Sequence, residues 1–141
     1  MVQYPHAPLG LILAGGAVGT TVRYLLGRVF PPTAGSFPWT TFTINVIGAF
    51  SLGLLVFALA RRGADAGGLR RLRLLLGTGV LGGFTTYSTF ALEVHGLLGG
   101  GQFWTGLGYA AGSVLTGVAA AAGGAILARW LVPVPPREAE W

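Results

Sequence analysis

The sequence predicts an all-α integral membrane protein, and its composition and the length of its apolar segments carry that prediction. Only 9% of the 141 residues are charged, 52% are hydrophobic, and the mean hydropathy is +0.68. Four apolar segments reach the roughly 20 residues that a helix needs to cross a bilayer. No positive charge precedes the first apolar segment, and three further apolar segments follow it. We therefore do not expect the first segment to be a cleaved signal peptide.

The chain is predicted to form one membrane domain, residues 1–141, because no composition shift marks a boundary. A stretch rich in proline and glycine separates the first segment from the second, and a stretch rich in arginine separates the second from the third. A Gly-Gly-Gly-Gln turn separates the third segment from the fourth. We expect the Pro-rich residues 133–141 to form a disordered tail. The predicted spans are about 8–30, 39–60, 72–98 and 103–132.

The net charge of +5 comes from nine arginines, with no lysine. Four spans would place both termini and the 61–73 loop on one side, which then carries seven of the nine arginines. Basic residues mark the cytoplasmic side of membrane proteins, so the termini are expected there. Because the arginines flank apolar segments rather than forming a basic-aromatic surface, we expect no nucleic-acid partner.

The third span is predicted to break within residues 82–90. Gly82 and Gly83 weaken the helix by roughly 1 kcal/mol each relative to Ala. The hydroxyl residues that follow can cap a restarted helix or bond freed backbone groups. A break in hydrocarbon is tolerated only where protein buries it or where it lines a cavity, and half-helix ends can face ions. This stretch therefore predicts an ion site, or at least a special packing point, at mid-membrane.

Polar residues recur at helical spacing on the second and fourth spans. Thr41 and Asn45 are four apart, and the fourth span carries a longer row at Thr105, Tyr109, Ser113 and Thr116 or Gly117. Each hydroxyl alone is more simply read as a hydrogen bond to a neighbouring helix or to its own backbone. A row beside a broken helix favours a polar track for a small hydrated solute.

A few further side chains have either a functional or a structural interpretation. Arg23 lies within the first span, where it serves an anion-attracting vestibule or extends its side chain to the interface. Glu93 and His95 follow the break as a relay or gate, or simply lie near the interface. Tyr87 and Phe90 share a helix face, and their ring edges can line an anion path or merely pack.

The residue types exclude most enzymatic chemistry. There is no cysteine, and the sequence shows no paired carboxylates, no His/Cys ligand cluster and no phosphate-binding loop. We therefore predict that the chain is not an enzyme.

Four motifs in order resemble those of the small bacterial Fluc-type (CrcB) fluoride channels, over nearly the full length of the chain. Residues 15–24, GGAVGTTVRY, are similar to the family's GGxxGAxxRY, and residues 41–48, TFTINVIG, to its TLxVNxxG. Residues 82–90, GGFTTYSTF, are similar to GGLTTFSTF, with Glu93 following, and Tyr109 and Ser113 match a pair on the last helix. The third motif is the most specific of the four.

The resemblance implies a passive, fluoride-specific channel that exports cytoplasmic fluoride across the bacterial inner membrane. It implies four transmembrane helices per subunit, an antiparallel dual-topology homodimer with two pores, and one structural sodium ion at its centre. The backbone carbonyls of Gly82 and Thr85 would hold the sodium, and Arg23 would lie near the aqueous vestibule. The implied fluoride path comprises Asn45, Tyr87, Phe90, Tyr109, Ser113 and Thr41, with Glu93, Thr86 and Ser88 as accessory residues.

The chain departs from this family pattern in three ways. Tyr87 stands where the family usually has Phe, and Gly117 stands where a further hydroxyl is often found, which Thr116 would have to replace. The arginine bias favours one orientation over a dual topology. Two other classes stay open: a four-helix proton-coupled drug exporter, which needs a carboxylate that the first span lacks, and a non-transporting membrane assembly subunit.

Overall fold

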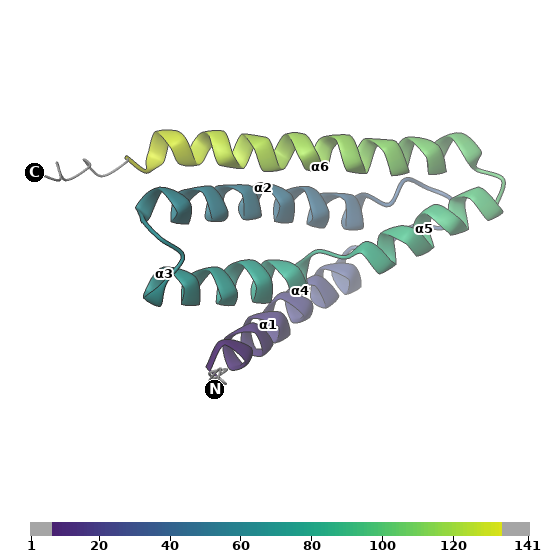
Figure 1. The fold of residues 1–141 in the computed structure, drawn as a ribbon. Helices are drawn as coiled ribbons and strands as arrows, with labels where there is room; N and C mark the ends of the chain where they lie inside the picture. The colour runs from purple at the N-terminus through teal and green to yellow at the C-terminus, as the bar shows by residue number, and fades with distance from the viewer. Residues whose placement is uncertain (1–6, 134–141) are drawn as a thin grey trace, which may run out of the picture.

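The computed structural model describes residues 7–133, and every regular element in that range is helical (Figure 1). Three of these helices are long and apolar enough to cross a membrane: α1, α2 and α6. The predicted first, second and fourth spans agree with these helices to within two residues. Most of the predicted tail, residues 134–141, lies outside the described residues. The elements are α1 (Ala7–Val29), α2 (Trp39–Arg62), α3 (Gly67–Leu72), η1 (Arg73–Leu81), α4 (Gly82–Phe84), α5 (Tyr87–Gly99) and α6 (Phe103–Leu131).

The predicted third span is a bent helix rather than a straight one. The π-helical segment η1 leads into α4, and the backbone then becomes extended at Thr85 and Thr86 before α5 begins. The break lies within the predicted range, although it does not fall at the two glycines that are predicted to weaken the helix. Gly82 and Gly83 both keep helical geometry, and the chain leaves the helix two residues later.

The glycines of the first and third spans serve close packing between helices. A β-carbon on Gly15 or Gly19 of α1 would overlap backbone atoms of η1 or α4. A β-carbon on Gly83 would in turn meet the carbonyl oxygen of Gly16 at 2.5 Å. Small residues let membrane helices approach in this way. The packing explains why α4 stays helical through two residues of low helix propensity.

The helices form two pairs that α5 connects. In Figure 1, α2 lies along α6, while α1 crosses beneath η1 and α4, and α5 runs outward to meet the start of α6. The α2–α6 pair is also close, because Gly124 of α6 lies against the backbone of Phe50. The two pairs meet where α2 faces the break, which places the extended residues between them.

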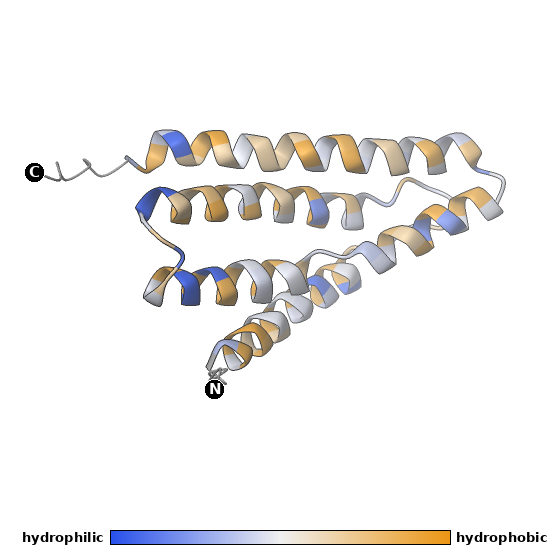
Figure 2. Cartoon of the chain, viewed as in Figure 1, coloured by the Kyte–Doolittle hydropathy of each residue, from blue (hydrophilic) through white to orange (hydrophobic). Residues whose placement is uncertain are grey.

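In Figure 2, α2 and α6 are mostly apolar along their length, and hydrophilic residues gather at the end of the molecule where α2, α3 and α6 lie together, with others on α1 and α5. On α6, Val114, Leu115 and Val118 are each more than 60% exposed. Side chains of this kind lower the free energy when lipid rather than water surrounds them. The distribution agrees with helices that cross a bilayer.

The predicted polar loop at residues 61–73 is shorter than expected. Helix α2 continues to Arg62 and α3 already begins at Gly67, so only residues 63–66 are non-helical. Arg73 donates two hydrogen bonds, of 3.0 and 2.7 Å, to the Asp65 carboxylate. These bonds hold the pKa of Asp65 below its ordinary value of 3.8. The arginine-rich connection is therefore a turn followed by a helix.

Candidate functional site

The break between α4 and α5 is built by two threonines with extended backbone. Thr85 has φ −76° and ψ 156°, and Thr86 has φ −145° and ψ 124°. Thr86 is the N-cap of α5, and its Oγ1 accepts a hydrogen bond of 3.2 Å from the amide of Thr89. This cap confirms the prediction that hydroxyl residues restart the helix after the break.

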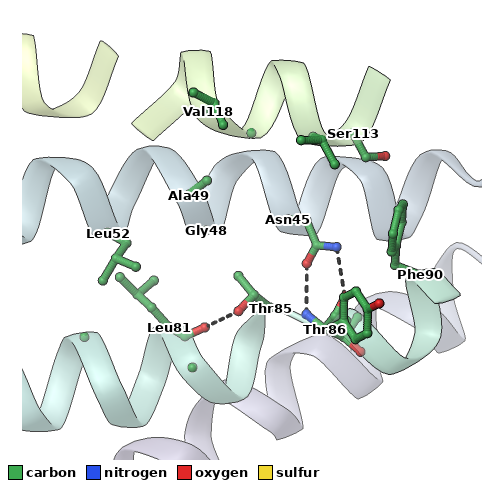
Figure 3. Close-up of a pocket in the computed structure, with 15 residues that line it drawn as sticks. Asn45, Gly48, Ala49, Leu52, Leu81, Thr85, Thr86, Phe90, Ser113 and Val118 are labelled. Atoms are coloured by element: carbon green, nitrogen blue, oxygen red, sulfur yellow. Dashed lines mark hydrogen bonds between the residues drawn. The ribbon is translucent and has the colours of Figure 1, made fainter. Parts of the chain in front are cut away.

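Asn45 of α2 bonds both polar groups of the Thr86 backbone. Its Nδ2 donates to the Thr86 carbonyl at 3.0 Å, and its Oδ1 accepts from the Thr86 amide at 2.9 Å (Figure 3). Because a backbone amide can only donate, the orientation of the Asn45 side-chain amide is determined. One of its two N–H groups is thus engaged, and the second is available to another acceptor.

The break deprives the carbonyl oxygens of residues 82–85 of the amides that a continuous helix would supply. In a continuous helix Gly82 would accept from the amide of Thr86, and Thr85 from the amide of Thr89. Those two amides instead donate to Asn45 Oδ1 and to Thr86 Oγ1. The carbonyls predicted to hold a cation, those of Gly82 and Thr85, are therefore among those released. Carbonyl oxygens are suitable ligands for a hard cation, and sodium is one.

Arg23 contributes to the same region from α1. Its Nε donates to the carbonyl of Gly83 at 3.1 Å, and the Thr20 hydroxyl donates more weakly to the same oxygen at 3.4 Å. The guanidinium thus bonds the end of the first half-helix, where cations are favoured by the helix dipole. The structure shows this guanidinium bonded to a backbone carbonyl of the neighbouring half-helix, a contact that does not decide between the two interpretations offered above. The predicted place of Arg23 near a vestibule stays a prediction.

An open cavity of about 500 Å³ lies beside the break, between α2, α5 and α6 (Figure 3). Seven of the predicted site residues line it: Asn45, Gly82, Thr85, Thr86, Tyr87, Phe90 and Ser113. The remaining walls are apolar or lack a side chain, and they include Ala49, Leu52, Gly117 and Val118. The structure thus brings the broken helix and part of the polar row to one cavity.

The hydroxyl of Ser113, in the α6 row, is unengaged. Its Oγ is buried and has no hydrogen-bond partner anywhere in residues 7–133. Buried hydroxyls normally find a partner, and an exception calls for an explanation. Thr116 does not replace the hydroxyl missing at Gly117, because it donates to the carbonyl of Gly112 at 2.6 Å and is exposed. Gly117 lines the cavity, so the wall has no hydroxyl group at the position where the family often has one.

The other polar residues gather around Glu93 rather than around the cavity. Thr41 donates to one carboxylate oxygen at 2.7 Å and Tyr109 to the other at 2.6 Å. Tyr109 is fully buried, and its ring centroid lies 5.2 Å from those of Phe37 and Phe90. Phe90 therefore touches both the cavity and this cluster. The hydroxyl protons of Thr41 and Tyr109 point to Glu93, so an anion would have to compete with a carboxylate for them.

Three predicted residues are largely exposed, and one of them, Tyr87, also lines the cavity. Tyr87 is 80% exposed, although its ring lies 6.1 Å from that of Phe90. Ser88 is exposed, and its hydroxyl oxygen lies 3.3 Å from that of Thr86. His95 is exposed and makes no side-chain hydrogen bond to another described residue.

The sequence places Gly48 on the same face of the second span as Asn45, and Thr89 among the hydroxyl residues of the break. The structure shows what each of them contacts. Gly48 lies against the Thr85 side chain, so a β-carbon there would push the break away from α2. Thr89 supplies the amide that Thr86 caps. Gly48 follows Asn45 by three residues, so both lie on one face of α2, but the sequence did not indicate that Gly48 contacts Thr85.

Comparison with known proteins assigns a family to this arrangement. Residues 10–125 match the family described as CrcB-like protein, Camphor Resistance (CrcB). A "Fluoride-specific ion channel FluC 2" of Leifsonia xyli is 50% identical over 110 residues, which are 78% of this chain and 75% of the relative. A "Fluoride-specific ion channel FluC 1" of Cutibacterium acnes is 43% identical over 88% of this chain and 81% of the relative. A "Fluoride-specific ion channel FluC" of Caulobacter vibrioides is 43% identical over 84% of this chain and 93% of the relative.

These matches cover most of the chain and most of each relative, and they confirm the resemblance drawn from the motifs. Together with three helices that can each cross a bilayer, they make the chain a multi-pass membrane protein. The chain belongs to the CrcB-like protein family.

Proposed function

We propose that this chain forms a fluoride-specific ion channel that lets cytoplasmic fluoride leave a bacterial cell passively through the inner membrane. The observation that carries the proposal is the cavity beside the broken helix, where an amide N–H of Asn45 and the unpaired hydroxyl of Ser113 are available. The relatives named above are described as fluoride-specific ion channels, not enzymes, in agreement with the prediction of a non-enzyme.

Fluoride chemistry suits these groups. Fluoride is a small, strongly hydrated anion, so a narrow path must replace its water with hydrogen-bond donors. Asn45 and Ser113 supply donors without a fixed positive charge, which would hold the ion too tightly for release. The ring of Phe90, between the cavity and Tyr109, adds a partly positive edge.

The proposed subunit has four transmembrane passes, with the bent η1–α4–α5 segment as the third. The break divides this segment, so it is not one continuous helix long enough to cross a bilayer. A bent helix can still cross the membrane when its unbonded backbone groups are covered by protein or water. The four-pass count places both described ends of the chain on the same side.

The proposed assembly is an antiparallel homodimer with dual topology. The cavity is open in a single subunit, and Gly82 is exposed beside it. The freed carbonyls of Gly82 and Thr85 cannot face lipid without a large free-energy cost. A second copy that covers the break would remove that cost, and two copies would create two cavities.

The proposed cofactor is a structural sodium ion at the centre of the dimer. Each subunit would offer the Gly82 and Thr85 carbonyls, and a bound cation would hold the two breaks together by neutralising their facing oxygens. Asn45 and Thr86 maintain the extended backbone that frees these carbonyls. The predicted residues thus fit such a group.

The two alternatives are less well supported. A proton-coupled exporter would need a carboxylate within the first span, and α1 contains none. An assembly subunit without transport would explain the glycine packing but not an unpaired buried hydroxyl beside an open cavity.

The proposed function is tested by fluoride efflux from proteoliposomes that contain the purified protein, followed with a fluoride electrode. We expect rapid fluoride efflux and no efflux of chloride from matched vesicles. Absence of fluoride efflux from correctly folded dimers would refute the channel and favour the assembly subunit. Dimerisation is tested separately by cross-linking a cysteine placed at exposed Tyr87 in this otherwise cysteine-free chain.

A further inference from the structure

One end of the molecule is strongly basic. The C-terminal ends of α2 and α6 and the short helix α3 lie together there, at the left of Figure 2. We call this surface the basic end. Six arginines lie on it: Arg61, Arg62, Arg70, Arg71, Arg73 and Arg129.

Two of these arginines have partners within the molecule. Arg73 forms an ion pair with Asp65 at 2.7 Å, and the Nε of Arg61 donates to the carbonyl of Val132 at 2.6 Å. The second bond joins the end of α2 to the end of α6. Both arginines thus contribute to the structure of this end.

The other four arginines are exposed. Within residues 7–133, none of them forms an ion pair or a side-chain hydrogen bond. The one acidic residue at this end of the described chain, Asp65, is already paired with Arg73. The basic end therefore presents Arg62, Arg70, Arg71 and Arg129 with their guanidinium groups unneutralised by described residues.

Exposed apolar side chains next to Arg129 place this end of α6 at the edge of the bilayer. Trp130 is 83% exposed and Leu131 is 63% exposed, and both directly follow Arg129. Tryptophan is typical of the headgroup level in membrane proteins. Long arginine side chains beside it can lie along apolar surface while their charged groups reach the lipid phosphates.

We propose that the basic end binds the headgroups of anionic phospholipids through Arg62, Arg70, Arg71 and Arg129. A guanidinium donates two parallel hydrogen bonds to a phosphate, which a lysine ammonium does not do. A zwitterionic lipid offers the same phosphate, but its own cationic group opposes binding to a basic surface. Clusters of four or more basic residues beside a membrane helix favour anionic lipid, by about 1 kcal/mol for each residue near the surface.

The proposal can be measured because the basic end has its own tryptophan. Substituting Trp39, Trp104 and Trp141 by Phe leaves Trp130 as the sole reporter. The variant is reconstituted in bilayers that mix plain lipid with brominated phosphatidylglycerol or brominated phosphatidylcholine, whose bromine quenches nearby tryptophan. We expect the association constant at Trp130 to be at least about five-fold larger for phosphatidylglycerol, the effect of one engaged arginine.

A reporter at the opposite end provides the matched control. Trp104, 80% exposed at the start of α6, is retained instead of Trp130. We expect nearly equal quenching by the two lipids there. Equal quenching at Trp130, or the same preference for phosphatidylglycerol at both reporters, would overturn the proposal.

Arginine variants then test the residues themselves. In the Trp130 reporter, the combined Arg62→Gln, Arg70→Gln, Arg71→Gln and Arg129→Gln variant should lose the preference, while Arg28→Gln at the other end should keep it. Folding is checked by size-exclusion chromatography. If the combined variant does not fold, single Arg70→Gln and Arg71→Gln variants should each reduce the preference, and an unchanged preference in both would reject the assignment.

Discussion

Asn45 and Thr86, 41 positions apart, exchange two hydrogen bonds across the helix break. The side-chain oxygen of Asn45 takes the place of the helical acceptor that the Thr86 amide has lost, and its side-chain nitrogen adds a bond to the Thr86 carbonyl. The same amide retains one N–H with no acceptor among the described residues, and Asn45 lines the cavity. Asn45 thus has a structural task and, in the proposed function, a place on the ion path.

Asn45→Asp is expected to abolish fluoride efflux. A carboxylate at this position puts a fixed negative charge beside the path and repels the anion. It also cannot donate to the Thr86 carbonyl, a loss of about 1–3 kcal/mol of stability. Efflux from proteoliposomes and thermal unfolding in detergent would be measured together. Unchanged efflux would remove Asn45 from the path.

Ser113→Ala should slow fluoride efflux without lowering stability. The Ser113 hydroxyl has no protein partner among the described residues, so its removal breaks no bond within the described chain. The matched control is Thr116→Val on the same helix, whose hydroxyl bonds its own backbone away from the cavity. We expect the control to conduct like the parent. Equal rates for Ser113→Ala and the parent would show that this hydroxyl does not contact the ion.

Gly15→Ala should destabilise the protein by about 1–3 kcal/mol, the usual cost of overpacking. The added methyl group would overlap the backbone of η1, which cannot move as a flexible side chain can. Gly16→Ala is the matched control, because a β-carbon there meets no atom within 4 Å. Chemical denaturation in detergent would compare the two. Similar stability for both variants would contradict the close approach of α1 and η1.

The Asp65–Arg73 pair should give a small acid-dependent contribution to stability. The folded-state pKa of Asp65 is lowered, so this contribution is complete above its ordinary value of 3.8 and is lost as the pH falls below it. Asp65→Asn should remove that dependence and leave stability at pH 7 nearly unchanged, because the pair is exposed. Thermal unfolding between pH 3 and pH 7 tests this. A parent and a variant with identical pH profiles would show that the pair contributes nothing.

Local features of the sequence determined the spans and the approximate place of the break. Hydropathy located α1, α2 and α6, because the length and composition of a helix that crosses a bilayer are properties of a contiguous segment. The hydroxyl-rich run after Gly83 predicted a restarted helix, and Thr86 caps α5 through an amide three residues away. The motifs also placed the chain in its family, because the matching residues can be read in order along the sequence.

Only the tertiary structure decided which polar groups meet. Glu93 accepts from Thr41 and Tyr109, 52 and 16 positions away, and Arg23 bonds Gly83 across 60 positions. The break came after the glycines rather than at them, since packing against α1 outweighs their low helix propensity. Hydrogen bonds and contacts between distant residues depend on how helices cross, and no local pattern contains that geometry. The sequence determined the helices, and their packing determined the cavity.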